Sequence, residues 1–440
     1  MKTNKQSEKI GIVGGGMLGL SLAYYLAKNG RTVVVVEKNS ELGGLAAGFK
    51  VGGANLERYY HHWFKSDVHV QELLKELDIY DKLHWYESKV GIFSQGKLYD
   101  FSTALSLLSF PKLNILERLR AGIVSFLLQK FRNYHKFENI SALDWCRKYY
   151  GEKVTAIIWE PLLKGKFGSY FDQVSMSWLW ARIFDRSSSR PSALGPEYLG
   201  YPDGGFQILI DTLVKKCRQL GVKFLTNVEI KKYRYLPAGK HRLEFIQQGQ
   251  NKKFDFNKLI ATVPAPIFIN IFKPQGKFLR SLKKINYLGA ICMVLVLKHK
   301  FMPYYWLNIV DPKLPFLAVI EHTNYIAANK YQGKHILYVA KYLAVDHTQF
   351  TMSDKKLYNL YYQKLAKINP HFKSSWVEEK NLFRTAFAQH IVNKGYQVPA
   401  YETDKEGLYF ANFCQVYPHD RGTNYAVAQA QDLTRLIINE

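Results

Sequence analysis

Residues 10–45 restrict the folds open to this chain of 440 residues more than any other segment, because they combine strand, turn and helix signals in a set order. A short apolar run over 10–13 leads into a G-x-G-x-x-G pattern formed by Gly14, Gly16 and Gly19. Gly14 permits the tight turn, Gly16 lets the backbone approach a pyrophosphate, and Gly19 lets the following helix pack closely on the strand. The pattern predicts a strand, a phosphate-binding turn and a helix.

The residues after the turn complete this unit. A helix is predicted over 17–29, rich in Leu and Ala, and its N-terminus is expected to hold phosphates. The β-branched run over 32–36 suits a buried parallel strand. It ends on Glu37, whose carboxylate can accept both hydroxyls of an adenosine ribose, so the whole unit predicts dinucleotide binding. Within it, the nucleotide contacts are expected from Met17, Leu18, Glu37 and Lys38.

A glycine pair follows the acid. Gly43, Gly44 and Leu45 begin six residues after Glu37, and a plain NAD site does not need them. With this pair, the chain resembles the FAD-dependent amine oxidoreductases, whose signature is the same fingerprint followed by an acidic residue and a Gly-Gly doublet. The resemblance implies that the nucleotide is FAD, that the doublet lies along its pyrophosphate, and that the chain is an oxidoreductase.

Two later segments carry the same resemblance. In the family, a valine placed like Val228, after a segment like the one at Gly204, grips the adenine ring through its backbone. Near the end of the chain, a strand up to Asn412 precedes a helix expected to begin near Thr423. The resemblance implies that the first N–H groups of this helix, at Thr423 and Asn424, face the flavin and stabilise negative charge on the reduced ring. Relatives often have aspartate at the position of Asn412, where an amide can still form a hydrogen bond.

The expected fold class is α/β. A Rossmann-like FAD-binding domain of the glutathione-reductase type is interleaved with a second domain made of a mixed sheet and a helical cap. The chain is too long for one compact core. The FAD-binding domain is expected to comprise residues 1–57, 200–285 and 376–440. The substrate and cap domain is expected to comprise residues 58–199 and 286–375.

Tyr60, His61 and His62 are the leading candidates for polar groups beside the flavin, and they lie in an aromatic segment. In the relatives this position runs beside the flavin ring, and the galactopyranose mutases carry a histidine-rich loop there. Two adjacent histidines cannot both face one side of a strand, so at most one is expected to point at a given site. The alternative is a histidine held by hydrogen bonds for structural reasons.

The segments 159–168 and 175–178 resemble the part of protoporphyrinogen oxidases and phytoene desaturases in which a proline-led apolar turn precedes a helix over the substrate cavity. Trp178, Arg182 and Arg186 follow one another at the spacing of one helix face. Arg182 is the candidate catalytic residue here, since two arginines one turn apart can clamp a carboxylate or phosphate. The alternative is that the two arginines bind only solvent or a nearby acid.

The formal net charge of +25 is large, but Lys and Arg are scattered rather than run together, which argues against nucleic acid as a partner. An anionic membrane face or a phosphorylated substrate fits better, and the alternative is a basic surface that serves solubility. The stretch 105–131 is apolar and carries Arg118, Arg120 and Lys130. It is expected to form either a basic amphipathic helix at a membrane interface or a cap helix packed in the core.

The cysteines and the N-terminus bear on compartment and metal content. The four cysteines form no C-x-x-C pair, so neither a zinc site, a redox dithiol nor a disulfide framework is predicted, and a reducing cytosol is expected. The first nine residues lack an apolar signal core, and no apolar run is long enough to cross a bilayer. We therefore expect a cytoplasmic protein, either free or in peripheral contact with the inner face of the membrane.

The expected reaction is hydride abstraction from a C–H or C–N bond lying against the flavin. No second dinucleotide fingerprint is present, so oxygen, a quinone or another carrier is expected to take the electrons. The catalytic base and the small-molecule substrate, which is expected to be lipophilic or phosphorylated, are left open. One alternative is a mutase in which reduced FAD acts on a sugar nucleotide without net redox, as in UDP-galactopyranose mutase. Another is a binding protein stabilised by flavin.

Overall fold

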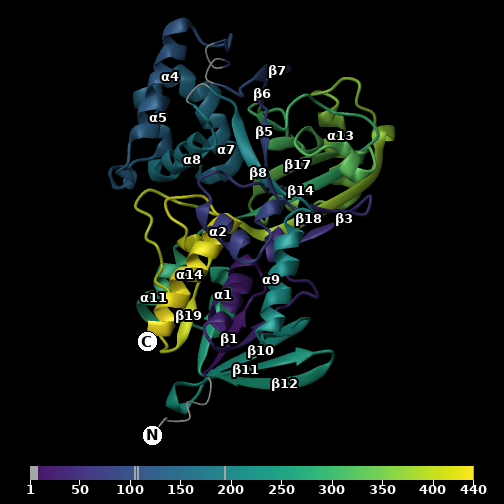
Figure 1. The fold of residues 1–440 in the computed structure, drawn as a ribbon. Coiled ribbons are helices and arrows are strands. Elements are labelled where there is room, and N and C mark those ends of the chain that lie inside the picture. The colour runs from purple at the N-terminus through teal and green to yellow at the C-terminus, as the bar shows by residue number, and fades with distance from the viewer. Residues whose placement is uncertain (1–7, 104–105, 107–108, 193–194, 440) are drawn as a thin grey trace.

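The computed structural model describes residues 8–103, 106, 109–192 and 195–439. A five-stranded parallel sheet, in the order β19-β13-β1-β2-β9, forms the centre of the lower half of the molecule (Figure 1). β1 and β2 are almost fully buried, as their continuous apolar sequences predict for parallel strands. The strands are β1 (Lys9–Val13), β2 (Thr32–Val36), β9 (Lys223–Leu225), β13 (Lys258–Ala261) and β19 (Leu408–Phe410).

Helix α1 (Met17–Lys28) follows the glycine turn and packs against both α9 (Gln207–Gln219) and α14 (Thr423–Asn439). Gly19 permits the close start of this helix, because a Cβ there would lie 2.0 Å from the carbonyl oxygen of Gly14. The chain thus forms the βαβ unit that residues 10–45 predict. Together with the parallel sheet, it confirms the Rossmann-like α/β class.

Smaller elements surround this sheet. Strands β10, β11 and β12 form a separate antiparallel sheet at the bottom of the molecule (Figure 1), and β3 pairs with β4 in a hairpin. These strands are β3 (Gly48–Val51), β4 (Ala54–Glu57), β10 (Val228–Tyr235), β11 (His241–Gln247) and β12 (Gln250–Phe256). The accompanying helices are α2 (Val68–Glu76), α10 (Ala265–Phe272) and α11 (Gly276–Lys283).

A second large sheet has seven strands in the order β18-β14-β17-β16-β15-β6-β7. It is mixed, because β15 runs parallel to β6 while the other neighbours run antiparallel. Helix α13 (Asp354–Leu365) packs on one face through Leu357 and Tyr361. The strands are β6 (Val90–Ser94), β7 (Lys97–Asp100), β14 (Tyr287–Leu297), β15 (Trp306–Ile309), β16 (Ala318–Glu321), β17 (His335–Leu343) and β18 (Val377–His390). Beside it lie β5 (Leu83–Ser88), which pairs with β8 (Glu197–Pro202), and the short helix α12 (Thr348–Thr351).

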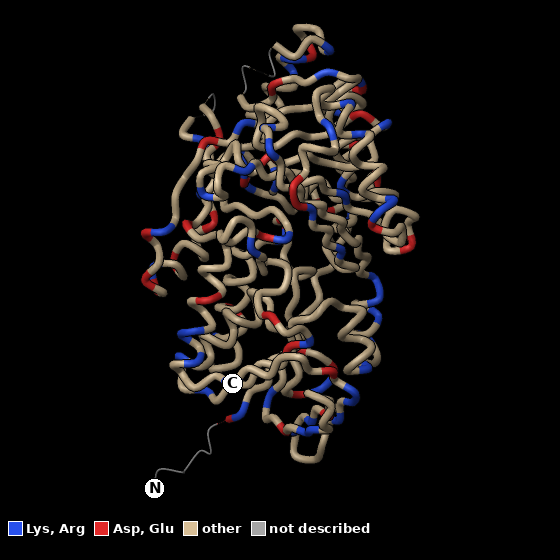
Figure 2. The backbone as a smooth tube through the Cα atoms, turned by 90° about the vertical axis from the view of Figure 1, so that its right-hand side faces the viewer, with Lys and Arg blue, Asp and Glu red and all other residues tan. Residues whose placement is uncertain are grey.

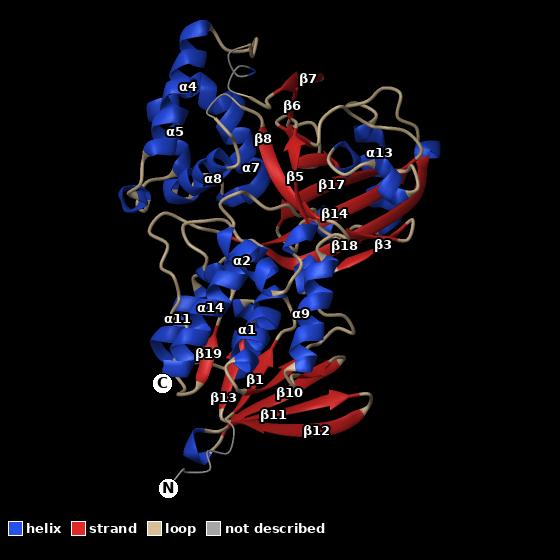
Figure 3. Cartoon of the chain, in the orientation of Figure 1, coloured by secondary structure: helices blue, strands red, loops and turns tan. Residues whose placement is uncertain are grey.

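A group of helices stands beside the seven-stranded sheet and forms the cap (Figure 3). Their apolar residues, among them Trp145, Phe167 and Trp178, form one core, which also includes Leu288 of β14. A π-helical turn, Thr155–Trp159, joins two of them. Such turns are rare in proteins, and those that occur are often found at functional sites. The helices are α4 (Ile115–Lys130), α5 (Ala142–Tyr150), α6 (Glu152–Val154), α7 (Glu160–Phe167) and α8 (Met176–Ser188).

The expected domain boundaries stay a prediction, and the structure places two elements differently. β18 follows residue 376, where the FAD-binding domain was expected to resume, yet it pairs with β14 at the edge of the seven-stranded sheet. Helix α2, expected in the cap domain, packs against α14 of the nucleotide domain. Which strand or helix an element packs against depends on tertiary contacts, and a local sequence pattern does not encode these contacts.

Candidate functional site

The glycine turn and the Gly-Gly doublet meet at the N-terminus of α1. The Gly43 N–H donates to the Gly15 carbonyl at 2.7 Å, and Gly44 lies against Gly16. A Cβ added to Gly16 would meet only the Cα of Gly44, at 3.9 Å, so open space lies before this backbone. A pyrophosphate needs such space next to the N–H groups at a helix start. These residues therefore fit the pyrophosphate of FAD.

Glu37 holds its carboxylate beside the same turn. Its Oε2 accepts from the Gly15 N–H at 2.7 Å and its Oε1 accepts from the Asn39 N–H at 2.9 Å. Each oxygen keeps a lone pair, so the carboxylate can still accept ribose hydroxyls. Lys38, next to it, is exposed. The Val228 N–H already donates to the Glu37 carbonyl at 3.0 Å, so in this structure that N–H is not free to bind an adenine ring.

The start of α14 is fixed by two hydrogen bonds, one from Trp63 and one from α2. The Trp63 indole N–H donates to Thr423 Oγ1 at 2.7 Å, and the Val70 N–H donates to Asn424 Oδ1 at 3.1 Å. The side chains of Thr423 and Asn424 are thus committed to structure. Both residues line the cavity described below, and the contact of their backbone N–H groups with FAD stays a prediction.

Asn412 has a local structural role. Its side-chain oxygen accepts from the Cys414 N–H at 3.2 Å, and its backbone N–H donates to the Gln415 side chain at 2.7 Å, which makes a capping box for the turn after β19. Gln429 of α14 donates to the Asn412 carbonyl at 3.1 Å. The residue therefore ties β19 to α14, and its contact with FAD stays a prediction.

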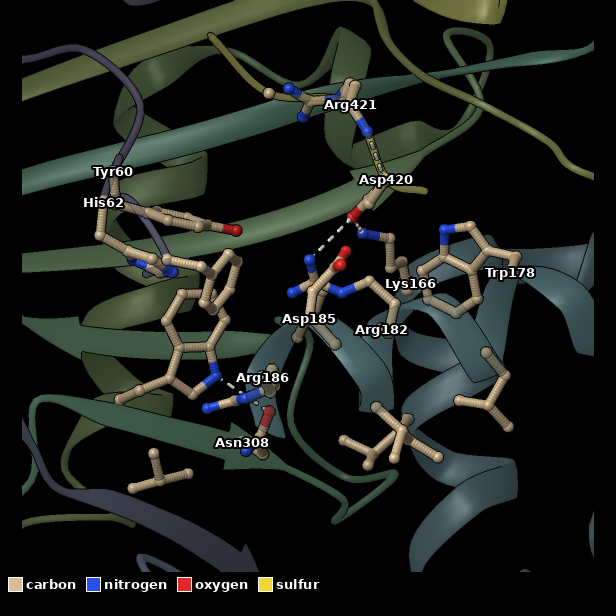
Figure 4. Close-up of a pocket in the computed structure, with 18 of the residues that line it drawn as sticks. Tyr60, His62, Lys166, Trp178, Arg182, Asp185, Arg186, Asn308, Asp420 and Arg421 are labelled. Atoms are coloured by element: carbon tan, nitrogen blue, oxygen red, sulfur yellow. Dashed lines mark hydrogen bonds and ion pairs between the residues drawn. The ribbon is translucent and has the colours of Figure 1, made fainter. Parts of the chain in front are cut away.

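A cavity of about 490 Å³ lies between the helical cap, the seven-stranded sheet and the start of α14. Figure 4 shows Tyr60 and His62 on one side of it, and Asp420, Lys166 and Arg182 gathered on the other. Most of the wall is aromatic or aliphatic, which suits a flat or lipophilic molecule. The apolar wall includes Phe64, Ile92, Ile158, Leu163, Trp178 and Trp306.

His61 and His62 are both among the residues that line this cavity, but their rings have different neighbours: the His61 ring centre lies 5.3 Å from that of Phe206, and the His62 ring centre lies 6.2 Å from that of Trp306. The expectation that at most one of them faces a given site therefore stays a prediction, although residues 58–62 are irregular rather than a strand. His61 Nδ1 contacts the Tyr59 carbonyl, and His62 Nδ1 lies 3.1 Å from the Tyr305 hydroxyl. Burial lowers the pKa of His61 to about 4 and that of His62 to about 3. Both rings are therefore neutral near pH 7.

Asp420 is the centre of a buried charge cluster in this cavity. Its Oδ2 lies 2.6 Å from Lys166 Nζ and 3.8 Å from Arg182 Nη1, and its Oδ1 accepts from the Arg421 N–H at 3.1 Å. Burial by itself raises the pKa of Asp420, but the charges of Lys166, Arg182 and Arg421 outweigh it and hold that pKa well below its usual range. Three cations thus share the Asp420 carboxylate, so this Asp420 cluster taken by itself has a net positive charge. The carboxyl groups of Asp67 and Asp185 also line the cavity, and Asp185 lies 3.1 Å from His419 Nδ1.

Arg186 does not complete a clamp with Arg182. Its Nε and Nη2 donate to the two oxygens of Glu197 at 2.9 and 2.7 Å, a bidentate pair with a fully buried carboxylate. For Arg186 the alternative interpretation, a nearby acid, therefore holds. The cluster residues that the sequence analysis missed are Lys166, Asp420 and Arg421. They stand in the two segments, 159–168 and 417–426, that resemble the family, and their charges were the signal available for finding them.

The carboxylate of Glu57 contacts Gly205 and Phe206, the two residues that precede α9. Its Oε1 accepts from the Phe206 N–H at 2.7 Å and its Oε2 accepts from the Tyr201 hydroxyl at 2.8 Å. A Cβ on Gly205 would lie 2.8 Å from Oε1, so only glycine lets the carboxylate approach. Glu57 therefore stands at the N-terminus of α9, where negative charge is favourable. Burial nevertheless raises its pKa from 4.5 to about 7.

We expect Glu57→Gln to remove part of the pH dependence of stability. Because the folded-state pKa of Glu57 is raised, its contribution to the free energy of unfolding is largest below its usual pKa and is lost as pH rises from about 4.5 to about 7. The loss is on the order of 3 kcal/mol for a fully buried group. Urea unfolding of both proteins at pH 5 and pH 8 measures the difference. Identical pH dependence in the two proteins would contradict the assignment.

Comparison with known proteins places the chain in context. The family model for flavin-containing amine oxidoreductases matches residues 18–413. The chain is similar to the 15-cis-phytoene desaturases of Solanum lycopersicum, with 32% identity over 160 residues, and of Synechococcus elongatus, with 40% identity over 88 residues. These matches cover 32% and 20% of this chain, and they cover only 27% and 18% of the two desaturases.

Solved structures extend the likeness over the whole chain. A protein proposed to be a protoporphyrinogen oxidase, from Exiguobacterium sp. 255-15, has a TM-score of 0.74 at 17% identity, covering 99% of this chain and 100% of that one. Reduced UDP-galactopyranose mutase has a TM-score of 0.74 at 16% identity, covering 98% and 96%. Putrescine oxidase bound to putrescine has a TM-score of 0.72 at 15% identity, covering 99% of both chains. At these identities the likeness concerns the fold alone.

Proposed function

Because the chain belongs to the family of flavin-containing amine oxidoreductases, which are FAD-dependent enzymes, we propose that it abstracts a hydride from a C–H or C–N bond of a substrate with an apolar body and an anionic group. The cavity carries this proposal. Its apolar wall, its two neutral histidines and its cationic Asp420 cluster all line one cavity, together with the first residues of α14. The apolar wall suits a lipophilic body, the histidines suit a neutral polar group, and the cluster suits a phosphate or carboxylate.

Arg182 is the residue best placed to bind the anionic group. At 3.8 Å from Asp420 it is beyond ordinary hydrogen-bond distance, so its N–H donors remain available to a ligand. Its guanidinium lies 5.5 Å from the centre of the Phe64 ring, which restrains the group while leaving its charge in the cavity. Lys166, by contrast, is bound directly to Asp420 at 2.6 Å.

The chain's own residues supply positioning and electrostatics. When bound, FAD supplies the two-electron acceptor for the hydride. The aromatic wall excludes water from the reacting bond. His61 and His62, being neutral, can orient a polar group of the substrate without adding charge. The N–H groups at Thr423 and Asn424 present the positive end of the α14 dipole to negative charge that develops nearby.

Oxygen or a quinone is the terminal electron acceptor in this proposal. The chain has one dinucleotide fingerprint, at Gly14 to Gly19, and no second one for a nicotinamide cofactor. An acceptor that meets the flavin directly is therefore the simpler arrangement.

A mutase acting on a sugar nucleotide is the second candidate, and the net positive charge of the Asp420 cluster favours it, because a nucleoside diphosphate sugar carries two phosphates. Such an enzyme requires reduced FAD but consumes no reductant per turnover. Redox balance therefore separates the two candidates.

The first test uses the protein purified without added cofactor, with its visible spectrum recorded and the released chromophore identified by mass. The holoprotein is then mixed without oxygen with lipophilic phosphates and carboxylates, with simple amines and with sugar nucleotides. Bleaching of the flavin by a lipophilic anion supports the proposal. Conversion of a sugar nucleotide only after chemical reduction, with no reductant consumed, supports the mutase. Bleaching by simple amines alone would overturn the substrate class.

We expect Arg182→Met to raise KM for an anionic substrate by about 10- to 100-fold, the cost of one charged hydrogen bond. The flavin content should not change, because Asp420 keeps Lys166 as its partner. Steady-state kinetics with the substrate from the anaerobic screen provide the measurement. Arg280→Met, on the exposed side of α11, is the matched control. An unchanged KM in Arg182→Met would rule out this arginine as the anion-binding residue.

A further inference from the structure

The outer face of α4 is an exposed apolar stripe. Six of its side chains are between 46% and 74% exposed, and they recur at helical spacing over roughly 120° of the helix circumference. The helix lies at the outer edge of the cap, far from the nucleotide-binding sheet (Figure 1). The stripe is formed by Ile115, Leu116, Leu119, Ile123, Phe126 and Leu127. Of the apolar stretch predicted from sequence, residues 105, 107 and 108 lie outside the described part.

The opposite face of α4 lines the substrate cavity through Ala121, Ser125 and Gln129. A second cavity, of about 260 Å³, opens at the C-terminal end of the same helix and is lined by the exposed Phe126. The two cavities share Gln129, Ser187 and Arg190 in their walls. The second cavity, at the edge of the apolar stripe, is therefore adjacent to the substrate cavity.

The ends and flanks of the stripe are basic. Arg120, Lys130, Arg132 and Lys136 are exposed around α4. The Lys130 ammonium lies 5.6 Å from the centre of the Phe126 ring, so a long cation stands directly beside the apolar surface. Lys and Arg are spread over the backbone as a whole (Figure 2), and the formal net charge is +25. An apolar face bordered by cations complements the acyl boundary and head groups of an anionic bilayer.

We propose that α4 docks the protein on an anionic lipid bilayer, with the stripe in the acyl boundary and the second cavity opening toward the lipid. No helix among the described residues is long and apolar enough to cross a bilayer, so α4 lies along the surface. The orientation gives a lipophilic substrate a path from the bilayer to the flavin side of the cavity. Only this last consequence rests on the proposed function.

The experiment measures sedimentation of the holoprotein with vesicles of phosphatidylcholine alone and of phosphatidylcholine with phosphatidylglycerol. Binding is expected with the anionic vesicles and is expected to weaken as salt is raised. The triple variant Leu116→Glu, Ile123→Glu, Leu127→Glu is expected to lower the partition coefficient by about 100-fold or more. Its matched control, Leu220→Glu, Val345→Glu, Val398→Glu, changes exposed apolar residues elsewhere and is expected to bind like the parent.

The orientation has its own test. The fluorescence of the tryptophan in Phe126→Trp is expected to be quenched by phosphatidylcholine that carries a doxyl group on its acyl chain. The fluorescence of the tryptophan in Leu220→Trp is not expected to be quenched. Absence of binding to either vesicle, or equal binding by the two triple variants, would overturn the docking surface. If the parent protein is a dimer that does not bind vesicles, and the stripe variant is a monomer, the face would instead be assigned to contact with a second copy of the chain. None of these readouts depends on turnover, so failure of the proposed reaction leaves them unchanged.

Discussion

Gly16→Val will yield protein that folds but is purified with almost no FAD, with activity reduced at least about 100-fold. The valine side chain would enter the open space before the Gly16 backbone, where a Cβ meets only Gly44 at 3.9 Å. The fold therefore tolerates the change, while a pyrophosphate is displaced. Flavin absorbance per protein and the thermal midpoint of the apoprotein are the two measurements. Full flavin occupancy would contradict the assignment of this turn.

Two other glycines separate the loss of cofactor from the loss of fold. Gly19→Val places its Cβ 2.0 Å from the Gly14 carbonyl oxygen, so both flavin and thermal stability are expected to fall. Gly122→Ala in α4 meets nothing within 4 Å and is expected to retain both. If Gly16→Val lost stability as severely as Gly19→Val, release of FAD would be a consequence of unfolding.

Asp420→Asn will destabilise the protein by about 3–5 kcal/mol, because it leaves Lys166, Arg182 and Arg421 in a buried site without their counter-charge. Since the pKa of Asp420 is depressed in the folded state, this stabilisation is present above its usual pKa of 3.8 and is lost as pH falls further. The difference in the free energy of unfolding between parent and variant should therefore be constant near neutral pH and should become smaller below about pH 4. Urea unfolding across this range is the measurement.

The double variant Lys166→Met, Asp420→Asn checks the origin of that loss. Removing both partners of the 2.6 Å ion pair takes away one of the uncompensated cations. The loss in the free energy of unfolding is therefore expected to be smaller in the double variant than the sum of the losses in the two single variants. Asp172→Asn, at an exposed position, is expected to change stability by less than about 0.5 kcal/mol. Strict additivity in the double variant would show that the pair is not coupled.

The nucleotide-binding unit is predictable from sequence because its requirements are local. Gly14, Gly16 and Gly19 permit the backbone conformation of a single strand-to-helix turn, and Glu37 comes directly after the end of a strand. The shared face of Trp178, Arg182 and Arg186 is equally local, since it needs only the helical period. In each case the residues that must cooperate lie within a few turns of one another along the chain.

The sequence by itself thus determined the βαβ unit, the Rossmann-like class and the helix that carries Arg182. Only the tertiary structure decided which charges meet: Asp420 pairs with Lys166 across 254 residues of sequence, and Arg186 is taken by Glu197. It also decided that six apolar residues of α4 face outward while Ala121 and Leu128 pack inward, where the sequence allowed core or surface. These outcomes depend on contacts between distant segments, and a contact of that kind has no period or spacing that marks it in the sequence.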